Sequence, residues 1–268
     1  MRKFGVLLVC FCLVVAPAAS AQSAKSVFID ELTWTELRDL VRAGETTILI
    51  PIGGTEQSGP DMALGKHNVR VKALSGKIAL ALGNALIAPV MAYVPEGGVN
   101  PPTAHMRFPG TITLPDDVFE KTLEYAARSF KLHGFRDIVF LGDHGGYQID
   151  ERIVADRLNR EWAKTPVRVH AMPEYYRVTQ SEYVRALKDK GYSTAEIGNH
   201  AGLADTSLML AIDPGMVRLA RLSTDTKLGA ADGVYGDPHR STAELGQIGV
   251  DLIVSRTVEA IRKAVERR

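Results

Sequence analysis

Short apolar runs that end at glycine alternate along this chain with longer segments of helical periodicity. The runs at 46–52 (TTILIPI) and 137–141 (DIVFL) are rich in β-branched residues, and glycine follows each of them. In the segments between such runs, apolar residues recur at helical spacing, which is typical of amphipathic helices. Strands that alternate with helices fold into a mostly parallel sheet with helices on both faces. The sequence therefore predicts an α/β fold.

The predicted elements divide most of the chain into strands and helices. Strands are expected over 46–52, 85–94, 137–141 and 167–172. Helices are expected over 31–43, 69–82, 116–132, 149–162 and 243–265. A long loop rich in glycine and proline covers 95–113, and long ordered loops are often functional. Because ligands of parallel sheets gather beyond the carboxyl ends of the strands, we expect the site in the loops that contain His67 and His144.

The first 21 residues have the pattern of a secretory signal. Two basic residues open the chain, an apolar run follows over 6–15, and 19–21 (ASA) offers the small residues of a cleavage site. A run of about ten residues is shorter than the ~20 needed to span a bilayer. We therefore expect cleavage after Ala21, a single mature domain over 22–268, and a periplasmic or secreted protein that is not held in a membrane.

The composition narrows the chemistry of the mature chain. The balance of 32 basic and 31 acidic residues argues against a broad nucleic-acid surface, which needs a clustered basic excess. Both cysteines, Cys10 and Cys12, lie in the expected leader. A metal site in the mature protein must therefore use His, Asp and Glu side chains, because no thiolate is available.

Three segments concentrate such side chains beside glycines, and they cover 53–68, 142–147 and 199–207. Glycine lets a loop backbone pack close to a site, and imidazole and carboxylate groups suit zinc, manganese or iron. A single histidine in a glycine loop is more often a turn residue than a ligand. The order and spacing of all three segments therefore carry the prediction of a metal site.

The arrangement of these segments resembles that of the creatininase (creatinine amidohydrolase) family over roughly residues 30–265. The matching segments are Gly-Gly-Thr-Glu-Gln-Ser-Gly-Pro at 53–60, Phe-Pro-Gly-Thr-Ile at 108–112, Gly-Asp-His-Gly-Gly at 142–146, His-Ala-Gly-Leu-Ala-Asp-Thr-Ser at 200–207 and Gly-Val-Tyr-Gly-Asp-Pro at 233–238. The resemblance implies a three-layer α/β/α fold with a mostly parallel central sheet. It also implies one or two divalent metal ions, and a homo-oligomer that is often a hexamer.

The resemblance implies roles for three residues. Glu56 and His144 match metal ligands of the family. His200 matches a histidine that could carry a proton near the substrate, and Glu56 could serve as a catalytic base in place of a ligand. The family hydrolyses carbon–nitrogen bonds in cyclic or formyl amides and, in one branch, in a small peptide.

Five positions depart from the family pattern. Ser58 and Asp61 stand where histidines are usual, and His67 replaces a bridging aspartate. Tyr147 replaces an asparagine, and Asp205 replaces a glutamate. Since His67 and Asp205 remain competent donors, the expected ligand set is Glu56, His67, His144 and Asp205. The loss of the bridging carboxylate favours one ion, because two close cations need shared anionic charge.

The sequence thus predicts a metal-dependent amidohydrolase that uses zinc or manganese, with iron as a further candidate, to activate water. Its substrate is expected to be a small amide, bound near His105, Asp61, Ser58, Tyr147 and His239. Creatinine itself is a poor candidate, because no tryptophan occurs between 175 and 207, where the family's creatinine pocket has them. Two alternatives remain open: a non-catalytic relative that binds a small ligand through a degenerate metal site, and a peptidase that acts on a short peptide.

Overall fold

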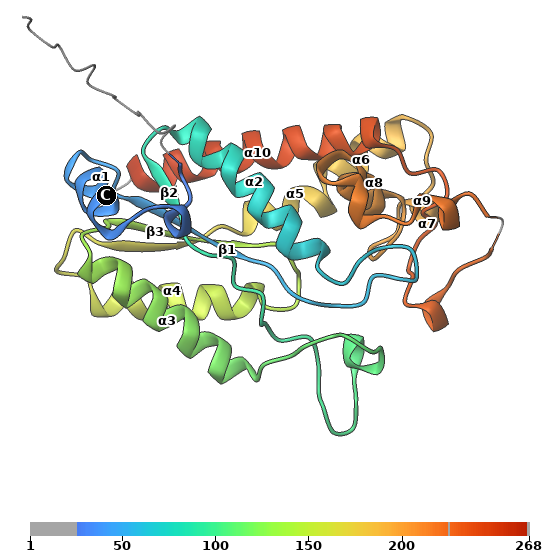
Figure 1. The fold of residues 1–268 in the computed structure, drawn as a ribbon, viewed down its shortest axis with the longest axis horizontal. Helices are drawn as coiled ribbons and strands as arrows, with labels where there is room; N and C mark the ends of the chain where they lie inside the picture. Colours follow the sequence, from blue (N-terminus) through green and yellow to red (C-terminus); the bar gives the residue numbers. More distant parts are fainter. Residues whose placement is uncertain (1–25, 225, 267–268) are drawn as a thin grey trace, which may run out of the picture.

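The computed structural model describes residues 26–224 and 226–266 (Figure 1). The predicted signal segment, 1–21, lies outside the described residues. Within the described residues, four parallel strands form a sheet in the order β2-β1-β3-β4. The strands are β1 (Thr47–Ile52), β2 (Ala85–Ile87), β3 (Asp137–Gly142) and β4 (Arg168–Ala171).

Helices cover both faces of the sheet. Side chains of a strand point alternately to its two sides, so the apolar strands present a surface on each face that helices bury. Leu49 and Val139 face a core shared with α2 (Lys66–Leu82), α5 (Pro173–Gln180), α6 (Glu182–Asp189), α8 (Leu203–Ile212) and α10 (Ala243–Glu266). Ile50 and Phe140 face a second core, shared with α1 (Trp34–Arg42), α3 (Asp116–Leu132) and α4 (Gln148–Glu161). The predicted three-layer α/β/α fold with a parallel sheet is confirmed (Figure 1).

Most predicted elements form close to their expected bounds, and two regions differ. The strand expected over 85–94 is regular only over Ala85–Ile87, because Pro89 has no amide hydrogen to donate to a sheet. The chain then returns to the sheet at Met91 through an isolated bridge to Ile52. Between 173 and 242 the sequence predicts no elements, yet the structure has α5, α6, α7 (Thr194–Ile197), α8 and α9 (Leu219–Leu222).

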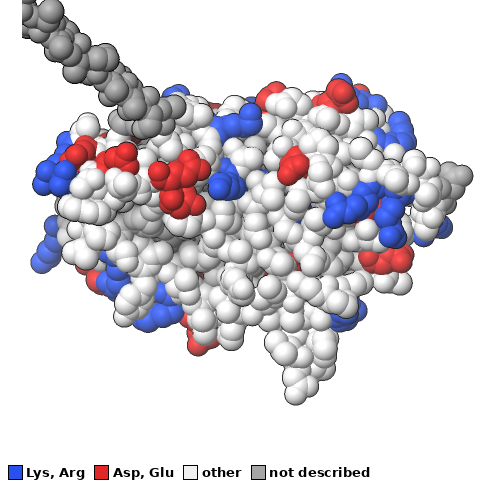
Figure 2. All heavy atoms as spheres, in the orientation of Figure 1, with Lys and Arg blue, Asp and Glu red and all other residues white. Residues whose placement is uncertain are grey.

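Short 3-10 turns complete the described elements, at Ile29–Glu31, Ala104–Arg107, Pro214–Met216 and Ala230–Asp232. No helix among the described residues is both long and apolar enough to cross a membrane. Basic and acidic side chains are interspersed on the face of the molecule that Figure 2 shows.

The strand order places the loops that follow β1 and β3 side by side. β1 has β2 on one flank and β3 on the other, so the connections leave these two central strands in opposite directions. Such a switch point opens a crevice at the carboxyl ends of the strands. The loop that carries Glu56 and the turn that carries His144 meet there, as the sequence predicts.

Candidate metal centre

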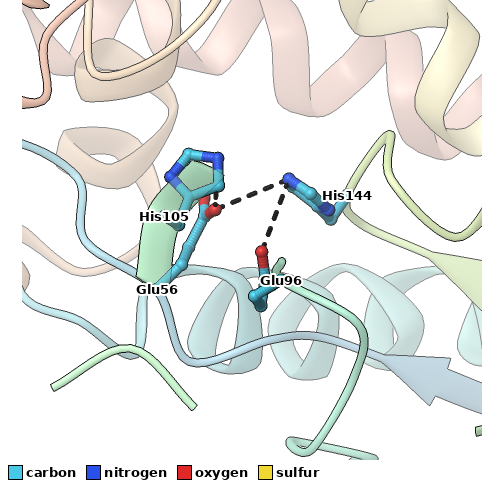
Figure 3. A group of neighbouring side chains, drawn as sticks. All are labelled: Glu56, Glu96, His105 and His144. Carbon is cyan, nitrogen blue, oxygen red and sulfur yellow. Dashed lines mark ion pairs between the residues drawn. The ribbon is translucent and has the colours of Figure 1, made fainter. Parts of the chain in front are cut away.

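Four side chains from four separate segments converge beyond the carboxyl ends of the strands (Figure 3). Glu56 follows β1, and Glu96 follows the segment that crosses from β2 past Met91. His105 lies on the 3-10 turn Ala104–Arg107, and His144 follows β3. One donor atom of each of these four residues lies within 4.8 Å of the donor atoms of the other three.

With both carboxyls of this group ionised, three of their four oxygens have no hydrogen-bond donor within the described part of the chain. They are Oε2 of Glu56 and both oxygens of Glu96, and all three are buried. Nε2 of His105 lies 3.2 Å from Oε2 of Glu56, and Nε2 of His144 lies 3.5 Å from the same oxygen and 3.8 Å from Oε2 of Glu96. A buried acceptor left unpaired costs free energy, and a divalent cation would pair with all three oxygens. The residues present therefore fit a metal ion.

The protonation of the group agrees with this fit. Burial, the charge of Glu56 and a hydrogen bond with Glu56 raise the pKa of Glu96 to about 9, so without a cation this carboxyl keeps its proton at neutral pH and shares it with Glu56. Burial lowers the pKa of His144 to about 4, so its imidazole is neutral. Metal ions bind deprotonated ligands and displace protons from them, and Glu96 holds such a proton.

Glu56 remains ionised because its second oxygen faces positive charge. Burial alone would raise the pKa of this carboxyl, but Lys66 and His67 outweigh burial and hold it well below its ordinary value. Oε1 of Glu56 lies 2.7 Å from Nε2 of His67 and 3.4 Å from Nζ of Lys66. The two oxygens of Glu56 thus face two different environments.

A network of charged side chains lies behind Glu56. Nδ1 of His67 is 2.6 Å from Asp143, and Arg70 joins Asp143 to Asp205 through bonds of 2.8 Å and 2.6 Å. Lys66 also pairs with Asp205, and together with Arg70 it outweighs burial and holds the pKa of this carboxyl well below its ordinary value.

The two ligands that the sequence predicts beside Glu56 and His144 have other partners in this network. The structure places His67 and Asp205 next to the group of four but not in it, because both nitrogens of His67 face carboxylates and Asp205 is engaged by two cations. Glu96 takes part in the group, although the sequence analysis did not single it out. It follows an apolar run and precedes two glycines, which is the pattern that marked the other loops.

His200 approaches the centre from the side of α8. Its Nε2 lies 2.9 Å from the carbonyl oxygen of Gln57, which only accepts, and 3.1 Å from the side-chain amide nitrogen of the same residue, which only donates. The first contact requires the hydrogen on Nε2 and the second requires it on Nδ1, which lies 3.7 Å from Oε1 of Glu56. Burial and the charge of Lys66 lower the pKa of His200 to about 3, so the ring is neutral at physiological pH.

A cavity of about 290 Å³ opens onto this group. His105, His144 and His200 line it together with Lys66 and Arg70. The rest of the lining includes three tyrosines, at Tyr176, Tyr183 and Tyr235, and the polar side chains of Asn199, Gln180 and Thr179.

Four of the residues that the sequence predicts for the substrate do not line this cavity. Asp61 accepts from Arg221, and His239 bonds to Asp237. Ser58 is buried, and its hydroxyl has no partner within the described residues. Tyr147 is fully buried, and its hydroxyl holds the turn before it by contacts with the backbone of residues 52, 53, 143 and 144. His105 is the predicted substrate contact that lines the cavity.

Comparison with known proteins adds a decisive match. The family model described as Creatininase, creatinine amidohydrolase, matches residues 30–261. This chain belongs to the creatininase family. It is 27% identical to the creatinine amidohydrolase of Pseudomonas putida over 264 residues, which cover 90% of this chain and 98% of that protein. It is 25% identical to the 3-dehydro-scyllo-inosose hydrolase of Thermotoga maritima, over 70% of this chain and 57% of that protein.

Solved creatininase structures have the same fold. A crystal structure of creatinine amidohydrolase superimposes with a TM-score of 0.75 at 26% identity, covering 90% of this chain and 98% of that chain. A creatininase structure described as the Mn form has a TM-score of 0.72 at 26% identity, covering 89% of this chain and 98% of that one. A mutant creatininase of the Zn-Zn type has a TM-score of 0.73 at 27% identity, with the same coverage.

Proposed function

We propose that this protein is a metal-dependent amidohydrolase that cleaves a carbon–nitrogen bond of a small cyclic or formyl amide. The observation that carries the proposal is the set of three buried carboxylate oxygens that have no donor among the described residues, beside two imidazoles, at the edge of the cavity. The creatinine amidohydrolase and inosose hydrolase among its relatives support hydrolysis of a small molecule.

Glu56, Glu96, His105 and His144 would hold the metal ion, and the relatives of the Zn-Zn and Mn types support zinc or manganese. An ion at such a site supplies Lewis acidity that activates water near neutral pH and stabilises negative charge on a carbonyl oxygen. The burial of Glu56 and Glu96 keeps much of the solvent away from that chemistry, which strengthens electrostatic interactions.

His200 is the proton carrier in this proposal. His200 lines the cavity, and in the tautomer with the hydrogen on Nε2 its Nδ1 takes a proton from the attacking water. An amide nitrogen is a poor leaving group until it is protonated, so the same atom then returns the proton to the leaving nitrogen. Proton transfer by a positioned side chain typically contributes ~10²–10⁴-fold to the rate.

The cavity limits the substrate to a small molecule. Its volume of about 290 Å³ is at the lower end of ligand pockets, which span roughly 300–1,000 Å³. Tyrosines line the cavity. Neither tryptophan of the chain lines it, since Trp34 lies exposed on α1 and Trp162 lies at the end of α4. A compact amide with hydrogen-bonding edges matches these walls.

The experiment that tests the function combines metal analysis with a panel of small amides. The mature chain, expressed from residue 22, is expected to retain zinc or manganese, to hydrolyse a cyclic or formyl amide, to lose activity with a chelator and to regain it with either ion. Less than about a tenth of an equivalent of any divalent metal, with no uptake of added zinc or manganese, would contradict the proposal.

We also propose that the protein is exported and cleaved after Ala21. The basic start, the apolar run and the small residues at 19–21 support this proposal. Amino-terminal sequencing of the protein from the periplasm or medium of the expressing cell is expected to begin at Gln22. A variant without residues 2–21 is the control and is expected to stay inside the cell. Full-length protein with an intact Met1 in the cell interior would count against export.

We further propose that the protein forms a homo-oligomer, with α3 as a contact between copies. Val118, Tyr125 and Leu132 lie seven residues apart on its outer face and are 43%, 60% and 82% exposed. Antiparallel contact between two copies of α3 would set Val118 against Leu132 and bring the acidic start of the helix near Lys131 at its end. Such a self-complementary patch suits a two-fold interface.

Light scattering after gel filtration tests the assembly. The wild-type protein is expected to elute as a dimer or a larger assembly, a hexamer by analogy with the family, and Tyr125→Glu is expected to reduce the number of subunits. Leu80→Glu changes an exposed leucine on α2 and serves as the matched control. A monomeric wild-type protein, or an unchanged Tyr125→Glu assembly, would contradict the proposed contact.

A further inference from the structure

Lys66 occupies an unusual place for a lysine. It is the first residue of α2, it is 1% exposed, and it lines the floor of the cavity. Its ammonium nitrogen lies 2.5 Å from Oδ2 of Asp205 and 3.4 Å from Oε1 of Glu56. A buried ammonium is strongly unfavourable unless carboxylates pair with it, so its position between these two side chains is a specific feature of the site.

The two oxygens of Glu56 divide the centre into two sides. Oε2 faces His105 and His144 and has no hydrogen-bond donor among the described residues. Oε1 faces the other way, toward Lys66 and His67. A metal ion can therefore bind Glu56 from the Oε2 side, while a fixed cation already holds the Oε1 side.

Lys66 supplies positive charge between the carboxylates of Glu56 and Asp205. Glu56, Asp143 and Asp205 are three neighbouring carboxylates, and Arg70 already bridges the last two. Without the ammonium group, Oε1 of Glu56 would keep its contact with His67 and Oδ2 of Asp205 its bond from the Ala201 amide, but no cation would lie between the two oxygens. Two carboxylates that face one space form a binding site for a hard divalent cation.

We propose that Lys66 is a built-in cation that takes the place of a second divalent ion between Glu56 and Asp205, and so limits the centre to one metal ion. This inference rests on the proposed metal-binding function. Lys66 acts as a positioning residue: it holds Glu56 so that only Oε2 is directed at the ion. In this proposal, Lys66 determines how many ions the chain binds, whether the metal is zinc or manganese.

The test is the number of manganese ions bound per chain, measured by elemental analysis after gel filtration and by titration calorimetry. Wild-type protein is expected to bind one ion. Lys66→Met keeps the length of the side chain without its charge and is expected to bind two, with an exchange-coupled manganese signal in electron paramagnetic resonance. Lys66→Arg keeps the charge and is expected to bind one. Lys188→Met changes an exposed lysine on α6 and is expected to behave as wild type.

The outcomes separate this inference from the proposed function. A wild-type chain that binds no manganese or zinc overturns the metal centre itself. A wild-type chain that binds two ions, or a folded Lys66→Met variant that still binds one, overturns the role of Lys66 and leaves the metal centre intact. If Lys66→Met is unfolded without metal, recovery of the fold on addition of manganese, with two ions bound, supports the inference. Failure to recover counts against it.

Discussion

The ring of His67 lies between two buried carboxylates, with Nε2 2.7 Å from Oε1 of Glu56 and Nδ1 2.6 Å from Oδ2 of Asp143. This contact joins the loop after β1 to the turn after β3. It also couples the candidate metal ligand Glu56 to the charged network around Arg70. In this geometry His67 orients the Glu56 carboxylate and does not face the group of four side chains, although its imidazole is also a competent metal donor.

Replacing His67 distinguishes these two roles. His67→Ala leaves two buried carboxylates without a shared partner, so the free energy of unfolding is expected to fall by about 2–4 kcal/mol. Because Glu56 loses its orientation, metal affinity is expected to fall by roughly 10–100-fold and not to vanish. Denaturant titration and calorimetry measure the two effects, with His133→Ala, an exposed histidine after α3, as the control. Complete loss of metal from a folded variant would show that His67 is a direct ligand.

His144 is expected to be indispensable for metal uptake. Its Nε2 is the nitrogen that faces both carboxylates of the group, and its low pKa of about 4 leaves it neutral at physiological pH. His144→Ala is therefore expected to abolish stable binding of zinc or manganese while the chain remains folded. Elemental analysis and circular dichroism check the two halves of this expectation. A variant that retains a full equivalent of metal would exclude His144 from the ligand set.

Glu96 is a candidate metal ligand that the sequence did not predict, and its replacement tests that role. Burial and Glu56 raise its pKa to about 9, and neither of its oxygens has a donor in the part of the chain that the structure describes. Glu96→Gln keeps the shape and removes the charge that a bound ion needs, so metal affinity is expected to fall by about 10-fold or more. Calorimetry at fixed pH measures the change, and Glu45→Gln, on the loop before β1, is the control. Unchanged metal affinity would exclude Glu96 from the ligand set.

Local sequence patterns account for much of the fold and for part of the site. The helix over 116–132 forms as predicted, because its apolar residues have clear helical spacing and its first turn is acidic. α8 was missed because it packs between α10 and α2, and its apolar composition on nearly all sides leaves no periodic signal. Glu56 and His144 were predictable because both lie in glycine-containing loops that follow apolar strands, and because both match metal ligands of the family that the sequence resembles.

The remaining site residues depend on contacts between distant segments. Glu96 shares the pattern of an apolar run followed by glycines with the other loops, but its burial beside Glu56 appears only in the folded chain. His67 and Asp205 have suitable donor atoms, but Lys66 and Arg70, which lie with His67 on the buried face of α2, determine which donors stay free. Residue type thus predicts which groups can bind a metal, and tertiary charge pairing decides which of them are available.

His200 is expected to affect turnover without affecting metal content. It lines the cavity, and it is not one of the four grouped side chains. His200→Ala is therefore expected to keep its metal and to lose about 10²–10⁴-fold in kcat on the substrate found by the amide panel. Steady-state kinetics and elemental analysis on the same preparation check both effects. Full activity in the variant would exclude His200 as the proton carrier.

Glu151 gives the folded protein a dependence on pH that is separate from the metal group. This carboxyl is 1% exposed, both of its oxygens lack donors within the described residues, and burial raises its pKa from 4.5 to about 8. The folded chain thus holds a proton that the unfolded chain releases near pH 4.5. The stabilising contribution is complete below that pH and is lost as pH rises through about 8.

In Glu151→Gln the new side chain is neutral at every pH, so the variant does not lose stability at this position as pH rises. The variant and the wild-type protein are expected to have similar free energies of unfolding at about pH 5, and at about pH 8 the variant is expected to be more stable by on the order of 3 kcal/mol. Urea denaturation at the two pH values measures the difference. Asp156→Asn, an exposed carboxyl on the same helix, is expected to show no such divergence. Parallel curves for Glu151→Gln and wild type would mean that Glu151 is ionised in the folded chain, with a cation or water as its partner.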